Sequence, residues 1–172
     1  MLMTLPHMIV LGIVYIGAFF AAWFGYWAIA FTGTLPPGIA RFVHNTLGWS
    51  TRITAWIASM RDEYPAFALE QSDYPAAVVI TEPTLDRSRG LAVTGILWGI
   101  KGILLFPHMI VLQILGFVAG IAGWIAYWEI AFTGVYPDGI YNFVLGTLRW
   151  SVRMNAWLFS LTDAYPPFTL KQ

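Results

Sequence analysis

The chain has 172 residues, of which 58% are hydrophobic and 10% charged, and its nine basic and nine acidic side chains cancel. A soluble domain usually carries about 25% charged residues, and one of this length could not bury so much apolar surface, so the composition indicates an integral membrane protein. The balanced charge gives no support for a nucleic-acid partner. The absence of Cys excludes disulfides, thiolate metal sites and thiol nucleophiles.

The first predicted element is the apolar run Leu5–Phe31. It is long enough to cross about 30 Å of hydrocarbon as one helix. The residues before it contain neither a basic region nor a cleavage site of small residues, which predicts a retained anchor rather than a signal peptide. A turn rich in Pro and Gly follows at Gly33–Gly38.

The second predicted element, Ile39–Met60, combines apolar side chains with one narrow basic stripe at helical spacing. The stripe consists of Arg41, Asn45, Gly48, Arg52, Ala55 and Ser59. Such a helix, with Trp side chains nearby, is typical of one that lies in the headgroup plane of a membrane. The alternative is a spanning helix whose Arg side chains face the interior of a bundle.

Residues 70–90 form a polar, Pro-rich linker in which Ala76–Thr81 has the composition of a short strand, although a single strand has no partner in this chain. The apolar run Leu91–Phe106 follows. It ends at Pro107, which either kinks one long helix or marks the turn of a helical hairpin.

The chain contains an internal duplication. A shift of 101 residues aligns Pro6–Leu69 with Pro107–Leu170 without a gap, and more than half of the aligned positions are identical. The sequence therefore predicts an all-α integral membrane protein of two tandem parallel repeats, each a transmembrane helix followed by an amphipathic in-plane helix, plus a short apolar helix before the second repeat. The predicted units are residues 1–69 and 91–172, joined by the linker.

Charge placement predicts the topology. Apart from Lys101, every Lys and Arg lies in residues 41–89 or 149–171. The positive-inside rule places both stretches in the cytoplasm, which predicts a multi-pass protein of the inner (cytoplasmic) membrane. Parallel repeats then need three crossings, with Leu91–Phe106 returning the chain outward. A rival arrangement has four long crossings and leaves Leu91–Phe106 in plane.

Three segments of the second unit, FPHMIVL, IAFTGVYPDGIYNFVLGTLRWSVRMNAW and TDAYPPFTL, are similar to a known family. The chain resembles the bacterial membrane family called domain of unknown function 4389. The resemblance covers Tyr74–Leu170 and, more loosely, Pro6–Leu69, where Arg61 and Ala66 depart from the family pattern. It implies the membrane architecture and assigns no catalytic residue.

The histidines are the first candidate site. His7 and His108 occupy equivalent positions, each between Pro and Met. A His near the start of a membrane helix is able to ligate haem, a chlorin or a metal. Because the neighbours are apolar and no carboxylate or second His lies within helical reach, we expect a capping or hydrogen-bonding role, and no cofactor or metal. His44 has no counterpart, since Leu145 replaces it.

The basic stripe is the stronger candidate for a binding surface. Arg52 and Arg153 recur at equivalent positions, and Arg149 adds a cation one turn away. Guanidinium groups bind lipid phosphate bidentately, or they pair with Asp62 and Asp163 of the same unit; both alternatives stay open. The predicted contact set for the bilayer, an anionic lipid or a partner is Arg52, Arg149, Arg153, Trp49, Trp56, Trp150 and Trp157.

Catalysis and transport have little support. Lys101 and Glu129 are the only charges inside the strongly apolar runs, and two isolated charges do not make an ion pathway. The sequence has no recognisable nucleophile–base pair, paired carboxylates or phosphate-binding loop. We therefore expect that the protein is not an enzyme.

The leading functional prediction is a structural or accessory membrane protein that grips the cytoplasmic leaflet and packs against other membrane subunits or copies of itself. Gly116, Gly120 and Gly123 lie on one helix face, which favours close helix packing. Two alternatives stay open: a carrier or channel formed at the repeat interface, and a haem- or pigment-binding protein that uses His7 and His108.

Overall fold

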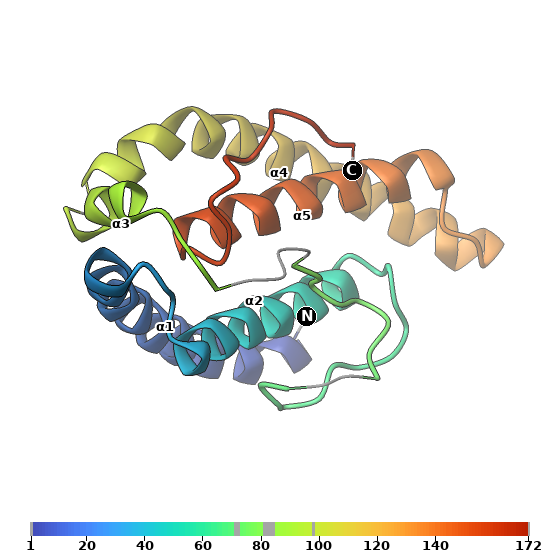
Figure 1. Cartoon of the computed structure of the whole chain (residues 1–172). Coiled ribbons are helices and arrows are strands. Elements are labelled where there is room, and N and C mark those ends of the chain that lie inside the picture. Colours follow the sequence, from blue (N-terminus) through green and yellow to red (C-terminus); the bar gives the residue numbers. More distant parts are fainter. Residues whose placement is uncertain (1, 71–72, 81–84, 98, 172) are drawn as a thin grey trace.

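The computed structural model describes residues 2–70, 73–80, 85–97 and 99–171 (Figure 1). Within these residues it contains a short 3-10 turn, Leu2–Thr4, and five α-helices: α1 (Leu5–Thr32), α2 (Pro37–Ile57), α3 (Arg89–Ile96), α4 (Gly99–Thr133) and α5 (Asp138–Leu158). The prediction of an all-α chain is confirmed. Of the predicted strand, residues 76–80 form no strand, and Thr81 lies outside the described residues.

The two long helices end at equivalent glycines. Gly33 has a φ of 83° and its N–H donates to the Ile29 carbonyl at 2.7 Å, while Gly134 has a φ of 74° and donates to Ile130 at 2.8 Å. Gly adopts this left-handed conformation without the steric cost of a Cβ. Each long helix is therefore followed by a tight turn, and Pro37 begins α2 with a φ that already suits a helix.

The apolar run before the second unit is divided differently from the prediction. α3 has 8 residues, about 12 Å of helix, which is too short to cross a bilayer. The chain turns at Leu97, and α4 then continues without interruption through Pro107 to Thr133. The predicted outward crossing by Leu91–Phe106 is therefore wrong. Two helices, Leu5–Thr32 and Ile100–Thr133, are long and apolar enough to cross a membrane.

α2 folds back along α1 over most of its length. Near the turn, the Ile39 side chain lies against Gly25, and at the opposite end Leu11 packs with Trp49 and Ile53. α5 packs against α4 as α2 does against α1. An in-plane helix that follows a crossing helix would touch it at one end only. The described hairpins, whose two helices pack along each other, therefore do not confirm the predicted pairing of a crossing helix with an in-plane helix.

The two units are related by an approximate two-fold axis. The Tyr26 hydroxyl donates to the Leu158 carbonyl, and its counterpart Tyr127 donates to the Ile57 carbonyl at 2.6 Å. Lys101, at the start of α4, lies 4.7 Å from the Tyr26 ring near the end of α1, so the two long helices run antiparallel (Figure 1). The sequence predicts parallel repeats, that is, two units with the same orientation in the membrane, whereas their long helices run in opposite directions. The units have the same orientation in a bilayer only if the axis lies along the membrane normal.

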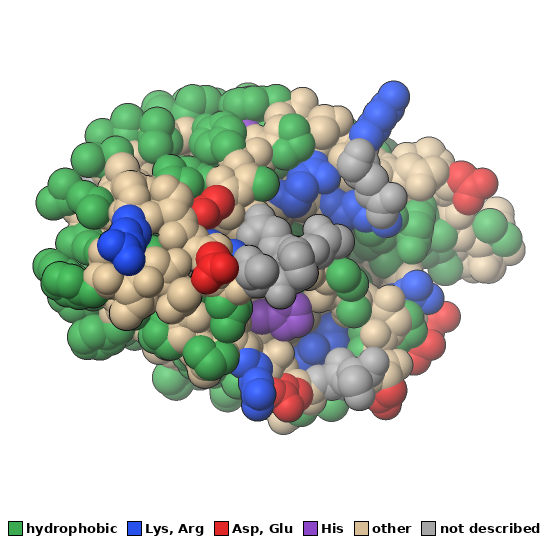
Figure 2. Space-filling view, in the orientation of Figure 1, with side chains coloured by type: hydrophobic (Ala, Val, Ile, Leu, Met, Phe, Trp, Pro, Cys, Tyr) green, Lys and Arg blue, Asp and Glu red, His purple; other side chains and the backbone are tan. Residues whose placement is uncertain are grey.

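The two faces of the molecule differ in polarity. α2, α5 and the linker lie in front of α1 and α4 in Figure 1, and Figure 2 shows charged side chains on this front face. The linker follows α2, because the His44 Nε2 lies 2.9 Å from the Val78 carbonyl and the Leu35 N–H donates to Leu85 at 2.9 Å. Large exposed apolar side chains belong mostly to α1 and α4, among them Ile9, Ile13, Ile16, Phe20, Phe24, Ile103, Ile110, Phe117, Ile121 and Trp128.

Candidate functional site

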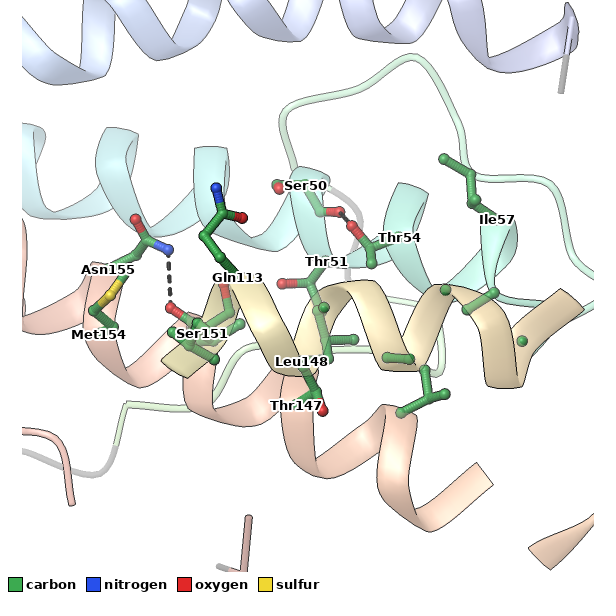
Figure 3. Close-up of a pocket in the computed structure, with 18 of the residues that line it drawn as sticks. Ser50, Thr51, Thr54, Ile57, Gln113, Thr147, Leu148, Ser151, Met154 and Asn155 are labelled. Atoms are coloured by element: carbon green, nitrogen blue, oxygen red, sulfur yellow. Dashed lines mark hydrogen bonds between the residues drawn. The ribbon is translucent and has the colours of Figure 1, made fainter. Parts of the chain in front are cut away.

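A pocket of about 720 Å³ lies between the two units, where α4 passes over α2 and α5 (Figure 3). We call it the interface pocket. Gly116, Gly120 and Gly123 line it from α4, and Tyr15 lines it from α1. Its polar lining comes from α2, α4 and α5 and consists of Ser50, Thr51, Thr54, Gln113, Thr147, Ser151 and Asn155.

The duplication explains why the pocket exists on one side of the two-fold axis. Gly116 and Gly120 occupy the positions of Tyr15 and Phe19 in the first unit, and Ala58 occupies the position of Phe159 in the second. In α1 the equivalent space is narrowed by the Phe19 and Phe159 rings, which leave a pocket of about 70 Å³. Three aromatic-to-small differences therefore open the interface pocket.

A second difference between the units is the helix α3, which covers the equivalent face of α1. Ala92 of α3 packs in one cluster with Ala18 and Ala22, and a Cβ added to Gly95 would lie 2.7 Å from the Tyr26 ring. In contrast, a Cβ added to any of the three pocket glycines of α4 would meet nothing within 4 Å. The α4 face therefore stands open where the α1 face is covered by a helix.

Most polar groups of the interface pocket are already satisfied within their own helices. The Thr54 hydroxyl donates to the Ser50 carbonyl at 2.9 Å, and Thr147 donates to Phe143 at 3.0 Å. The Asn155 Nδ2 donates to the Ser151 carbonyl at 2.8 Å (Figure 3). Because these groups do not depend on a ligand, the walls accept an apolar occupant without leaving buried donors unpaired.

The predicted histidines sit in two matching aromatic clusters. The Trp49 Nε1–H donates to the His7 Nδ1 at 3.2 Å, and the Trp150 Nε1–H donates to the His108 Nδ1 at 2.9 Å. Each imidazole stacks on a Phe of the segment that follows its unit's second helix, with ring centroids 3.6 Å apart for Phe67 and 3.8 Å apart for His108 and its Phe. The clusters fasten these segments to the helix hairpins.

Neither ring nitrogen of these histidines is open to a ligand. A Trp N–H that donates to Nδ1 requires the proton of the neutral imidazole to sit on Nε2. The Nε2 atoms of His7 and His108 are buried without a hydrogen-bond partner in the described structure, and both side chains are 0% exposed. The packing favours the hydrogen-bonding role over haem or pigment ligation.

The recurring arginines bond to the backbone of their own unit. The Arg52 guanidinium donates to the Ala68 and Leu69 carbonyls at 2.7 and 3.3 Å. Arg153 donates to the Thr169 and Lys171 carbonyls in the equivalent segment. These contacts differ from both alternatives drawn from the sequence, lipid phosphate and the Asp partners: Asp163 instead accepts from the Ser88 N–H at 2.6 Å.

The remaining predicted contact residues separate into two groups. Trp56 and Trp157 pack edge to face with Tyr64 and Tyr165, at ring centroid distances of 5.2 and 5.3 Å. Arg149 is half-buried and lines a second pocket on the polar face. The structure therefore brings Arg149 and Arg153 together, whereas the Trp side chains belong to the internal packing of each unit.

Two buried cations that bind the chain at the end of α5 were not recognised as such from the sequence. The Lys101 Nζ donates to the Trp157 carbonyl at 3.0 Å and to the Ser160 Oγ at 2.9 Å. The Arg87 Nε donates to the Ser160 carbonyl at 3.0 Å. Both satisfy carbonyls at the end of α5 that have no helical partner. The isolated Lys101 in an apolar run was the one available signal.

Among the residues that the structure describes, no three His, Asp or Glu side chains are grouped in a way that would hold a metal ion. A family model described as "Domain of unknown function (DUF4389)" matches residues 1–68 and again residues 97–169. The two matches coincide with the two repeats found by internal alignment. Neither a curated protein nor a solved structure matches the chain.

Proposed function

Since the chain belongs to the family described as a domain of unknown function, DUF4389, its own geometry has to indicate its role, and we propose that it is an accessory protein of the inner membrane. It is embedded in the cytoplasmic leaflet through α1 and α4, with α2, α5 and the linker at the water interface. Its task is to hold a helix of another membrane subunit in the interface pocket. The observation that carries the proposal is the uncovered α4 face beside an equivalent α1 face that is covered.

The distribution of polarity supports a position in one leaflet. The linker runs beside α2, and Glu70, Asp73 and Lys171 are exposed on the chain segments that cover α2 and α5. If α1 crossed the bilayer upright, these charges would lie at the depth of the hydrocarbon, where unpaired polar groups cost several kcal/mol each. If α1 and α4 lie flat, all of them face water, and both units share one membrane orientation.

Helix length supports the same position. α4 has 35 residues, which correspond to about 52 Å, against about 30 Å for the hydrocarbon core. An upright α4 would expose several turns of apolar side chains to water, including Phe132, which is 82% exposed. A flat helix keeps its whole exposed stripe in lipid.

Cysteine labelling at the starts of α2 and α5 tests whether α1 and α4 lie flat in the membrane. The equivalent glycines Gly38 and Gly139 are exposed, have room for a Cβ, and belong to a chain without Cys. We expect Gly38→Cys and Gly139→Cys to be shielded from an impermeant maleimide in intact cells and labelled in inverted membrane vesicles. Asp73→Cys on the linker supplies the cytoplasmic reference. If α1 and α4 cross, the two glycine positions lie on opposite sides, and labelling of only one of them in intact cells would disprove the flat position.

Three features favour a helix as the occupant of the interface pocket. The equivalent face of α1 is already covered by the helix α3, whose Gly95 lies against Tyr26. Small residues on α4 permit close backbone approach, which drives helix association in lipid. Gln113 at the pocket wall offers an amide that is able to hydrogen-bond across a helix interface.

Filling the pocket with the side chains of the first unit tests the accessory role. Gly116→Tyr combined with Gly120→Phe copies residues that α1 already accommodates, so the fold should tolerate the change. We expect the double variant to reach the membrane in normal amounts, with an unchanged or higher unfolding temperature, but to lose the partner that wild type retains after mild solubilisation and cross-linking. The mass of that partner distinguishes another subunit from a second copy of this chain.

The matched control is Gly12→Phe, which adds a ring to an exposed position of α1 with nothing within 4 Å. It should retain the partner. A double variant that retains the partner as well as wild type would show that the interface pocket is not the docking site, and a wild type that emerges alone and monomeric would refute the accessory role.

A further inference from the structure

A second pocket, of about 420 Å³, lies on the polar face between α2, α5 and residues 75–79 of the linker. We call it the arginine pocket. Three arginines line it, Arg61 from the chain after α2 and Arg149 and Arg153 from α5, and its described lining contains no acidic side chain. The rest of the lining is mainly apolar and includes Met60, Leu145, Leu148 and Val152.

Within the residues that the structure describes, no acidic side chain pairs with the charges of this pocket. Two nitrogens of Arg153 donate to the Lys171 and Thr169 carbonyls, and its Nε is buried without a partner in the described structure. Arg61 and Arg149 are half-buried, and no hydrogen bond or ion pair to either occurs within residues 2–70, 73–80, 85–97 and 99–171. Burial lowers the pKa of Arg153, and the neighbouring Arg149 charge lowers it further.

Three like charges in one half-buried pocket repel one another, and their hydration is reduced. A bound anion removes that repulsion, and the planar guanidinium fork matches the oxygens of a phosphate or carboxylate. The apolar walls next to Arg149 also favour contact with a hydrocarbon group. We therefore propose that the arginine pocket binds an amphipathic anion, a phosphate or carboxylate attached to an apolar group.

The internal duplication does not produce a second arginine pocket of the same composition. At the positions related by the 101-residue offset, Gly48 of the first unit corresponds to Arg149, and Thr162 of the second unit corresponds to Arg61. Only Arg153 has a charged counterpart, which is Arg52. Arg153 also has a separate structural role, because it donates hydrogen bonds to the Thr169 and Lys171 carbonyls. Arg61 and Arg149 are thus the residues specific to the pocket, and the equivalent positions show that the fold accepts uncharged residues there.

The inference does not depend on the accessory role, because the arginine pocket and the interface pocket lie on opposite sides of the contact between α2 and α5. Thr51, Leu148 and Val152 line both pockets and separate them. A ligand in one therefore does not need the other to be occupied.

The test compares two sources of the same chemistry, using the full-length protein in an uncharged detergent. In the soluble arm, binding of hexyl phosphate is measured by calorimetry, with hexanol as the uncharged match. In the lipid arm, native mass spectrometry counts phosphatidylglycerol retained after exposure to vesicles of phosphatidylcholine with one fifth phosphatidylglycerol. The variant is Arg61→Thr with Arg149→Gln, and the control is Arg41→Gln, which removes an exposed arginine outside the pocket.

We expect binding in at least one arm to weaken by about tenfold or more in the double variant and to be unchanged in the control, with the arm identifying a lipid or a soluble source. Hexanol should not bind. The unfolding temperature without ligand should stay constant or rise in the double variant, because the repulsion is gone. Failure of both probes to bind wild type, or equal binding by wild type and the double variant, would overturn the proposal. Failure of the pocket-filling experiment on α4 would leave this site unaffected.

Discussion

Replacement of Trp49 or Trp150 by Ala should cost each unit about 3–5 kcal/mol of folding free energy, the range for removal of a buried aromatic side chain. Both indoles are 4% exposed. Each also supplies the hydrogen bond to a histidine that has no other partner in the described structure, so truncation leaves both nitrogens of His7 or His108 unsatisfied.

The measurement is unfolding of the purified protein by a denaturing detergent in mixed micelles, followed by circular dichroism. Because the clusters are equivalent, the two single variants should lose similar amounts. Trp56→Ala is the matched control: this side chain is only half-buried and has a ring contact with Tyr64 in place of the imidazole bond. A loss at Trp49 no larger than at Trp56 would mean that the imidazole–indole pair does not hold the hairpin together.

The second large effect concerns the buried arginines. Arg52→Gln and Arg153→Gln should each reduce the folding free energy by about 2–3 kcal/mol, because each removes charge-assisted hydrogen bonds to two backbone carbonyls. Without them, residues 61–70 and 162–171 depend on the aromatic clusters and on a few other hydrogen bonds, such as those of Glu70 with Asn45 and of Asp163 with Ser88. We therefore expect these segments to become sites of rapid proteolysis while membrane insertion stays normal.

Arg41→Gln is the control for both, since Arg41 is an exposed arginine on the same helix as Arg52. Limited proteolysis followed by mass spectrometry locates the cuts. The contrary result is informative: if Arg52→Gln loses co-purified anionic lipid with no change in stability or proteolysis, Arg52 contacts lipid as the sequence first suggested, and its backbone contacts are dispensable.

Several features followed from the sequence because they depend on local patterns or on self-comparison. Composition predicted a membrane protein, and hydropathy marked two long helices, apolar enough to cross a membrane, whose ends at Gly33 and Gly134 are confirmed by their left-handed conformation. The 101-residue offset predicted equivalent structures, and matching contacts such as those of Trp49 and Trp150 occur at that offset. Self-alignment carries this information because identical side chains at identical spacing fold alike.

The orientation of the units and the partners of the charged groups were decided only by the tertiary structure. Hydropathy gives no information on the direction in which two long helices run relative to each other, and it suggested a crossing in Leu91–Phe106, where the chain instead turns at Leu97. The contacts of Tyr26 with Leu158 and of Lys101 with Ser160 join residues that are far apart in the sequence, so no local sequence pattern predicts them. Likewise, the helical stripe shows that Arg52 lies on the polar face of its helix. It does not show whether this side chain contacts lipid or, as in the structure, the Ala68 carbonyl.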